Sequence, residues 1–351
     1  MESLKVAIWF ALIGISLQTI TVPLTNYHDV IYRGKVSVGT PQQEFDAVYH
    51  TGCTLTRFPA KGCQASGRFA DACKPGKTYN PAASRSSRYY SFFKVVAVEY
   101  THFGSSGREY YDTLAFKDGK TGNELAVRNA FVGASNRVWG FDHAVVCLAS
   151  SAKRESNSTF VQMHNNRVLP KTLMTVALRK CDREHCEDGG AVTFGGYDRK
   201  NCRSFVQWMP LIEGSSAWRF RLDYLKINNH PVAQARRAIA NTDTGNSYIH
   251  FPKSWIPSVI ALLKVKKHGF YYTTDCKAKF SLVFVIGNRK FTVDQRDLIL
   301  NQQINGECVV AITENINDPR TLILGAAFHR AVCVIHDIDG RRLGFSLSAH
   351  H

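Results

Sequence analysis

A short motif that occurs twice constrains the fold of this chain more than any other feature of its sequence. His50-Thr51-Gly52-Cys53 and Asp243-Thr244-Gly245-Asn246 each follow a short apolar run, directly or after two intervening residues. Each half of the chain also carries a second apolar run downstream, at Val145–Cys147 and at Leu322–Leu324. A duplicated β unit, one in each half, explains this arrangement.

The rest of the chain also favours β structure. Its 351 residues exceed the usual size of one compact domain, and 44% hydrophobic with 21% charged residues is typical of a globular protein. Pro252–Leu263 is the best helix signal. Gly, Asn and Asp separate short strand-like runs. These runs are Val30–Val38, Phe45–Tyr49, Val95–Tyr100, Ala191–Phe194, Ser281–Ile286 and Cys333–His336. We therefore predict a mostly β protein.

The N-terminus has the pattern of a secretory signal. Lys5 precedes the apolar run Val6–Leu17, whose twelve residues are too few to cross a bilayer as a helix. The small residues Thr19 and Thr21 follow. We predict a signal peptide over residues 1–21, the alternative being a buried N-terminal helix. No later segment reads as a transmembrane helix, so we expect a soluble product.

Secretion gives a meaning to the ten cysteines, because thiols pair in an oxidising compartment. Metal binding is disfavoured, since the local pair Cys181 and Cys186 has no matching second pair of ligands. We predict no metal and no cofactor. The sequon Asn157-Ser158-Thr159 predicts glycosylation at Asn157.

The formal net charge of +16 indicates attraction to acidic partners or anionic membranes. The basic clusters are short, as at Arg236-Arg237 and Arg341-Arg342, and none alternates with aromatic residues in the manner of a nucleic-acid module. We predict no nucleic-acid binding. The plainer interpretation of these clusters is a set of solvated basic faces.

Further segments stand in a recognisable order around the two motifs. They are Tyr32–Pro41, Tyr79–Pro81, Tyr111–Thr113, Phe194–Asp198, Trp208–Pro210, Leu322–Gly325 and Gly344–Phe345. Together with the two motifs they resemble the pepsin-like aspartic proteases (peptidase A1), the family of pepsin and cathepsin D. The resemblance covers nearly the whole chain after the predicted signal.

The resemblance implies a bilobal fold of two pseudo-symmetric β lobes with a cleft between them. Residues 22–205 would form the N-terminal lobe and residues 206–351 the C-terminal lobe. It further implies a monomer with a peptide or protein ligand in the cleft, and it assigns supporting roles to both motifs and to a flap tyrosine. These supporting residues are Thr51, Gly52, Thr244, Gly245 and Tyr100.

The resemblance also bears on the cysteines. It implies three disulfides, and a fourth pair could close a small loop. These pairs are Cys276–Cys308, Cys63–Cys73 and Cys202–Cys333, with Cys181–Cys186 as the fourth. Cys53 and Cys147 are left over, and they are either free or paired.

The family's reaction needs two aspartates that share a proton, one as base toward water and one as acid toward the scissile carbonyl. Asp243 matches the second aspartate, but His50 stands where the first should be. An ion pair between them would lower the pKa of Asp243. Cys53 and Asn246 replace hydroxyl residues of the two motifs, and Arg57 stands in place of a tryptophan that supports the flap tyrosine.

Three functions follow, and whether the chain is an enzyme stays open among them. We favour a secreted, catalytically inactive or impaired homologue that binds peptide or protein in its cleft. The alternative is an active acid endopeptidase in which His50 and Asp243 form the catalytic pair. A third interpretation is a scaffold or carbohydrate-facing protein. The expected location is extracellular, or the lumen of an acidic secretory or lysosomal compartment.

Overall fold

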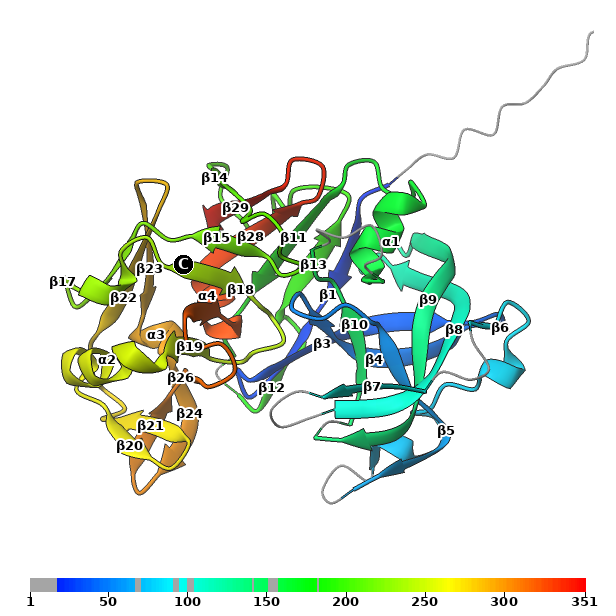
Figure 1. Ribbon diagram of the computed structural model, residues 1–351, viewed down its shortest axis with the longest axis horizontal. Helices are drawn as coiled ribbons and strands as arrows, with labels where there is room; N and C mark the ends of the chain where they lie inside the picture. The colour runs from blue at the N-terminus through cyan, green and yellow to red at the C-terminus, as the bar shows by residue number, and fades with distance from the viewer. Residues whose placement is uncertain are drawn as a thin grey trace, which may run out of the picture.

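A computed structural model describes residues 18–66, 71–90, 95–99, 104–140, 142–150, 157–181 and 183–351. Over these residues the chain is mostly β, as predicted, and it has the bilobal pepsin-like fold. Figure 1 shows strands of the first half on one side of the molecule, strands of the second half on the other, and a sheet built from both between them. Each predicted strand run overlaps a strand, although Tyr100 lies outside the described residues.

The sheet between the two lobes has six strands, three from each half of the chain. Their order is β1 (Ile20–Pro23), β13 (Gly190–Phe194), β11 (Leu173–Leu178), β28 (Val332–Asp337), β29 (Arg342–Leu347) and β14 (Gln207–Pro210). The two halves meet where β11 pairs antiparallel with β28. All six residues of β28 are buried, which matches a central strand covered on both faces. This sheet therefore joins the lobes through a shared core.

A ten-stranded sheet makes up most of the first lobe. Along the sheet the order is β12 (His185–Cys186), β2 (Thr25–Tyr27), β3 (Ile31–Val38), β4 (Gln43–His50), β10 (Ala144–Cys147), β5 (Arg57–Ala65), β9 (Glu124–Trp139), β8 (Gly104–Lys117) and β6 (Arg88–Tyr89), with β7 (Val95–Glu99) also paired to β8. Buried and more exposed residues alternate along β3, as expected for a strand with one face on the core.

The second lobe contains three smaller sheets. The first has the order β15 (Arg219–Arg221), β18 (Ile239–Thr242), β27 (Thr321–Leu324), β19 (Ile249–Pro252) and β26 (Ile312–Asn315). The second has β17 (His230–Pro231), β16 (Tyr224–Ile227), β22 (Ser281–Ile286) and β23 (Arg289–Asp294). The third has β20 (Lys266–His268), β21 (Tyr271–Thr274), β25 (Glu307–Val310) and β24 (Ile299–Ile304).

The described helices are short. They are α1 (Thr159–Asn165), α2 (Ile256–Leu263), α3 (Gln295–Leu298) and α4 (Ala326–Ala331), with 3₁₀ turns η2 (Pro81–Ala83), η3 (Ala233–Ala235) and η4 (Lys253–Trp255). The helix predicted from Pro252 is thus split, because its first residues form η4 and α2 begins only at Ile256. None of the helices in the described ranges has the length and apolarity needed to cross a bilayer.

The internal repeat is visible in the strand pairing. In the first lobe β4 runs parallel to β10, with His50 opposite Cys147. In the second lobe β18 runs parallel to β27, with Thr242 opposite Leu324. Continuing that register by one residue places Asp243 level with Gly325. Both motifs therefore leave the carboxyl end of a strand that has a parallel neighbour.

Five disulfides cross-link the described chain. Four are the pairs expected above, Cys63–Cys73, Cys181–Cys186, Cys202–Cys333 and Cys276–Cys308. The fifth joins Cys53 to Cys147, the two cysteines that the sequence left open, and no cysteine is free among the described residues.

Candidate functional site

The two motif turns meet at the junction of the lobes. His50 ends β4, and Asp243 follows the last residue of β18. The backbone of both turns is tied to the neighbouring parallel strand, because Leu148 N donates to the carbonyl of His50 (2.8 Å) and Asp243 N donates to that of Leu324 (3.0 Å). Both functional side chains are buried, with residue exposures of 4% for His50 and 7% for Asp243.

Two threonines lock the turns to each other by reciprocal hydrogen bonds. Thr51 N donates to Oγ1 of Thr244 (3.1 Å), and Thr244 N donates to Oγ1 of Thr51 (3.0 Å). Each hydroxyl then donates to a backbone carbonyl of the opposite lobe, Thr51 to Thr242 (3.2 Å) and Thr244 to Tyr49 (2.6 Å). These four bonds fix the distance between the lobes at the site.

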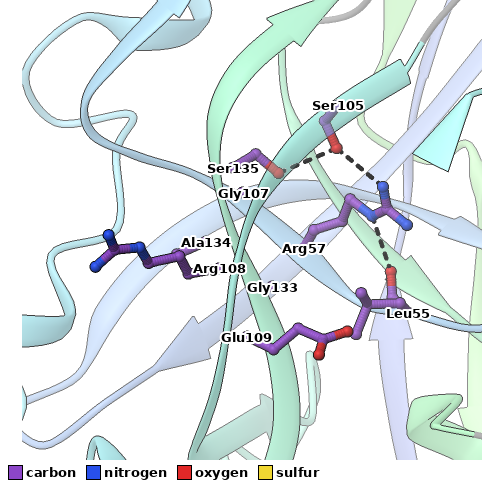
Figure 2. Close-up of a pocket in the computed structure, with 9 residues that line it drawn as sticks. All are labelled: Leu55, Arg57, Ser105, Gly107, Arg108, Glu109, Gly133, Ala134 and Ser135. Carbon is purple, nitrogen blue, oxygen red and sulfur yellow. Dashed lines mark hydrogen bonds between the residues drawn. The ribbon is translucent and has the colours of Figure 1, made fainter. Parts of the chain in front are cut away.

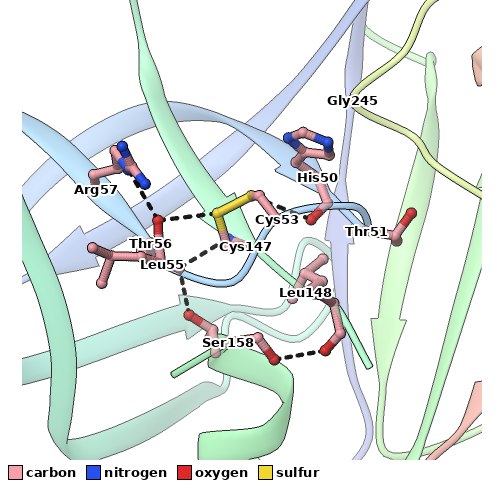
Figure 3. Close-up of a disulfide and its surroundings, with 12 residues drawn as sticks. His50, Thr51, Cys53, Leu55, Thr56, Arg57, Cys147, Leu148, Ser158 and Gly245 are labelled. Carbon is pink, nitrogen blue, oxygen red and sulfur yellow. Dashed lines mark hydrogen bonds between the residues drawn. A yellow bond between two sulfur atoms is a disulfide. The ribbon is translucent and has the colours of Figure 1, made fainter. Parts of the chain in front are cut away.

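The two glycines of the motifs are required by close approach. A Cβ on Gly245 would lie 2.1 Å from Cδ2 of His50, and a Cβ on Gly52 would lie 2.1 Å from Oδ2 of Asp243. Real Cβ atoms do not come so near other heavy atoms. Each functional side chain therefore packs on the glycine of the opposite turn. Figure 3 shows Gly245 beside the His50 ring.

His50 and Asp243 form a direct, buried ion pair, with Nε2 of His50 2.9 Å from Oδ1 of Asp243. Burial acts to raise the pKa of Asp243. The charge of His50, its hydrogen bond and the N–H of Gly245 outweigh burial and hold the pKa below its ordinary value. Asp243 is therefore a carboxylate over most of the pH range.

Both oxygens of Asp243 already accept hydrogen bonds. Oδ1 faces His50 Nε2 and accepts from Gly245 N (3.0 Å). Oδ2 accepts from the side-chain amide of Asn246 (2.9 Å). Gly52 packs against the same carboxylate. A water molecule that approached Asp243 would have to compete with donors already in place.

Arg57 lies in a small polar pocket between β5, β8 and β9 (Figure 2). Nη1 of Arg57 donates to Oγ of Ser105 (2.9 Å), and Nε of Arg57 donates to the carbonyl of Leu55 (3.2 Å). Oγ of Ser105 in turn lies 3.1 Å from Oγ of Ser135. Ser105 on β8 thus holds Arg57, and Ser135 on β9 supports Ser105. Tyr100, its expected neighbour at the flap, lies outside the described residues.

Two fully buried imidazoles lie against the strand pair that carries the second turn. Nδ1 of His329, on α4, is 3.0 Å from the carbonyl of Gly325, and Nε2 of His336, on β28, is 3.5 Å from Oγ1 of Thr242. Burial lowers the pKa of His329 to about 4 and that of His336 to about 3. Neither residue is a site candidate from the sequence alone, because an imidazole is found both at surfaces and in cores.

One group in the described part of the chain has the chemistry of metal ligands. It consists of Asp294, Asp297 and His351. Nε2 of His351 lies 2.5 Å from Asp297, and Arg296 lies 2.7 Å from Asp294. These groups satisfy one another as ion pairs, so we treat them as a structural network.

Comparisons with a family profile and with known proteins place this chain among relatives. The sequence matches the profile of the family described as eukaryotic aspartyl protease over residues 31–348. It is 30% identical to pepsin A of Gallus gallus, over 92% of this chain and 86% of that protein. It is 28% identical to aspartic protease 17 of Caenorhabditis elegans (95% and 87%) and 26% identical to pregnancy-associated glycoprotein 1 of Bos taurus (93% and 84%).

Proposed function

The chain belongs to the eukaryotic aspartyl protease family, and on that premise we propose that it is a secreted homologue with an impaired catalytic site. In this proposal His50 replaces the first catalytic aspartate, and the cleft between the lobes binds a peptide or a protein segment. The boundary between the two lobes that form the cleft lies between residues 205 and 206.

The impairment follows from the chemistry of the pair. Two carboxylates at close range share one proton, because both cannot ionise together, and this arrangement supplies a base and an acid at once. A histidine opposite Asp243 removes the like charge and replaces it with a hydrogen-bond donor. Asp243 then loses the shared acidic proton that would polarise a scissile carbonyl.

A single observation carries the proposal, namely that donors already occupy both oxygens of Asp243. A general base must lie within hydrogen-bond reach of the proton that it removes. The attacking water would have to share the carboxylate of Asp243 with His50, Gly245 and Asn246, and of these His50 and Gly245 hold its pKa low. We therefore expect hydrolysis to be very slow.

Ligand binding is supported by the parts of the site that remain. The threonine bonds between the turns and the glycine contacts keep the lobes in register. These features hold a peptide-binding cleft in shape without contributing an acid or a base.

The alternative function is an acid endopeptidase with a His50/Asp243 pair. It is favoured by the direct 2.9 Å contact and by the first three residues of the second motif, Asp243-Thr244-Gly245, which match the family. Asp243 would serve as the base and cationic His50 would stabilise negative charge that develops on the substrate.

The two functions are separated by a cleavage assay with a denatured protein substrate between pH 4 and pH 7. The protein tested is the secreted chain, and Asp243→Ala is the control. Circular dichroism checks that both are folded at each pH. We expect no cleavage by either protein, together with saturable binding of pepstatin by the natural chain. Cleavage that disappears in Asp243→Ala would establish the alternative. A folded chain that binds neither pepstatin nor peptides would leave the scaffold interpretation.

Two proposals concern maturation. Ile20 is 1% exposed and pairs with Phe194 in the six-stranded sheet, so we now place signal-peptide cleavage before Ile20 and not after residue 21. Asn157 is exposed and directly precedes Ser158, the N-cap of α1, which supports glycosylation there. N-terminal sequencing and mass before and after glycosidase treatment test both, and an N-terminus at Val22 would contradict the first.

A further inference from the structure

We propose that the Cys53–Cys147 disulfide is a positioning device that holds His50 against Asp243, and that ligand affinity of the cleft depends on it. The second part rests on the proposed function, whereas the first concerns the site alone. Figure 3 shows the disulfide directly beside the turn that carries His50.

The disulfide ties the turn to the end of β10. Cys147 stands opposite His50 in the parallel pairing of β4 and β10. After it, Leu148 N donates to the carbonyl of His50 (2.8 Å), and Ala149 N donates to that of Cys53 (3.0 Å). Both ends of the segment from His50 to Cys53 are therefore held by residues 147–149, and the disulfide adds a covalent bond to these two hydrogen bonds.

The surroundings of the disulfide leave it little freedom. Cys53 and Cys147 are 2% and 1% exposed. Cys147 N donates to Oγ1 of Thr56 (2.8 Å), which lies 2.6 Å from Oγ1 of Thr159 on α1. The bonded sulfurs carry no proton, so their approaches to the carbonyls of His50 (3.7 Å) and Leu55 (3.0 Å) are packing contacts. Such a buried, packed bond fixes backbone position.

The second turn achieves the same result by other means. The fourth residue of its motif, Asn246, donates its amide to Asp243 (2.9 Å), and its carbonyl accepts from Ala326 N (2.7 Å). The fourth residue of the first motif, Cys53, has no side-chain donor once oxidised. The covalent bond to Cys147 takes over the task of fixing the turn, and His50 is the residue whose place depends on it.

The test compares Cys53→Ser/Cys147→Ser with Cys202→Ser/Cys333→Ser. The two disulfides span 94 and 131 residues, so the loss of loop closure is similar in both variants. Two properties are measured at a temperature at which both variants are folded. One is the set of imidazole NMR signals of His50, assigned with His50→Gln, and the other is the dissociation constant for pepstatin.

We expect the first variant to shift or split the His50 signals and to weaken pepstatin binding at least tenfold. The control should leave the signals in place and the dissociation constant within twofold. Unchanged His50 signals in a folded first variant would overturn the proposal. If the natural chain does not bind pepstatin but the His50 signals respond, the positioning role stands and the proposed function fails.

A measurement on the unaltered chain covers the case in which the variant does not fold. Native-state hydrogen exchange of the Leu148 and Ala149 amides reports directly on the turn. We expect both amides to exchange only through global unfolding. Exchange through a local opening of much lower free energy would contradict the proposal.

Discussion

The two motif turns share one backbone design and differ in the chemistry of three positions, the functional residue, the fourth motif residue (Cys53 or Asn246) and the residue opposite the functional one. Each is held to the other by a threonine and packs its glycine against the opposite functional side chain. At the functional position the first turn has His50 and the second has Asp243. Opposite the functional residue, the first lobe has Cys147, which is bonded to Cys53, and the second lobe has Gly325. A Cβ on Gly325 would lie 2.4 Å from the carbonyl oxygen of Asn246, so a larger residue does not fit there.

This contrast separates what the fold requires from what catalysis requires. The threonines and glycines bear on the geometry of the lobe junction, and they are the same in both turns. The residues that bear on proton transfer differ, and so do their supports. A chain that binds in its cleft but does not hydrolyse needs only the shared part.

The largest effect is expected from adding a methyl group at either glycine of the motifs. Gly245→Ala would place Cβ against the His50 ring and Gly52→Ala would place it against the Asp243 carboxylate. Each should lower the free energy of unfolding by more than about 4 kcal/mol, because neither neighbour can retreat. Gly133→Ala is the matched control, since its Cβ would meet only ordinary contacts at 3.4 Å and beyond. Denaturant titration gives all three values, and equal small losses would contradict the close packing.

Removing the imidazole should cost somewhat less. His50→Leu leaves the buried Asp243 carboxylate without the imidazole that faces Oδ1, which we expect to destabilise the fold by about 3 kcal/mol and to raise the pKa of Asp243. His50→Gln keeps an amide donor and should cost clearly less. If the two variants were equally stable, the ion pair would contribute nothing to the junction.

Acid should weaken the second lobe before the first. His329 and His336 are neutral in the fold, with pKa values lowered to about 4 and about 3, so the unfolded chain binds more protons below pH 6.5. Their stabilising contribution is complete above that pH and is lost as the pH falls toward the folded values. His336→Phe should recover about 2 kcal/mol at pH 5.

The measurement for this prediction is hydrogen exchange at pH 7 and pH 5 on the natural chain and His336→Phe. Peptides from β18, β27 and β28 should lose protection first in the natural chain. Uniform loss across both lobes would remove this difference between them.

The smallest effect is expected from Asn246. Asn246→Ala removes one donor to Oδ2 of Asp243, while His50 and Gly245 keep theirs. The loss of unfolding free energy should be about 1 kcal/mol. Thermal and denaturant unfolding measure it, and a cost as large as that of His50→Leu would mean that the amide, and not the imidazole, holds the carboxylate.

The sequence predicted the fold and the pairing of the two turns well, because the repeated motif and the order of the surrounding segments specify them. The sequence leaves the pairing of Cys53 with Cys147 undecided, because motifs give no distance between two cysteines. The available signal for this fifth disulfide is that ten cysteines with four pairs assigned leave two. The small residues Thr19 and Thr21 predict a signal that ends at residue 21, and the pairing of Ile20 with Phe194 cannot be read from the sequence because the two residues lie far apart in the chain.

Other features depend on side-chain placement and lay beyond any pattern. Asn246 was noted only as a departure from the family, and its bond to Asp243 needs the rotamers of both residues. His329 and His336 lie in apolar segments that predict burial, but an imidazole is found equally at surfaces and in cores. The charge state of the site therefore required the structure.

The most direct test is the pKa of the Asp243 carboxyl group. Its titration is monitored by NMR on the natural chain with ¹³C-labelled aspartate, and the Asp243 signal is assigned by comparison with Asp243→Asn. We predict one titration step below the ordinary value for aspartate, with a pKa that rises in His50→Leu. A pKa at or above the ordinary value in the natural chain would mean that Asp243 is not an ion-paired carboxylate. The account of the impaired site would then be contradicted.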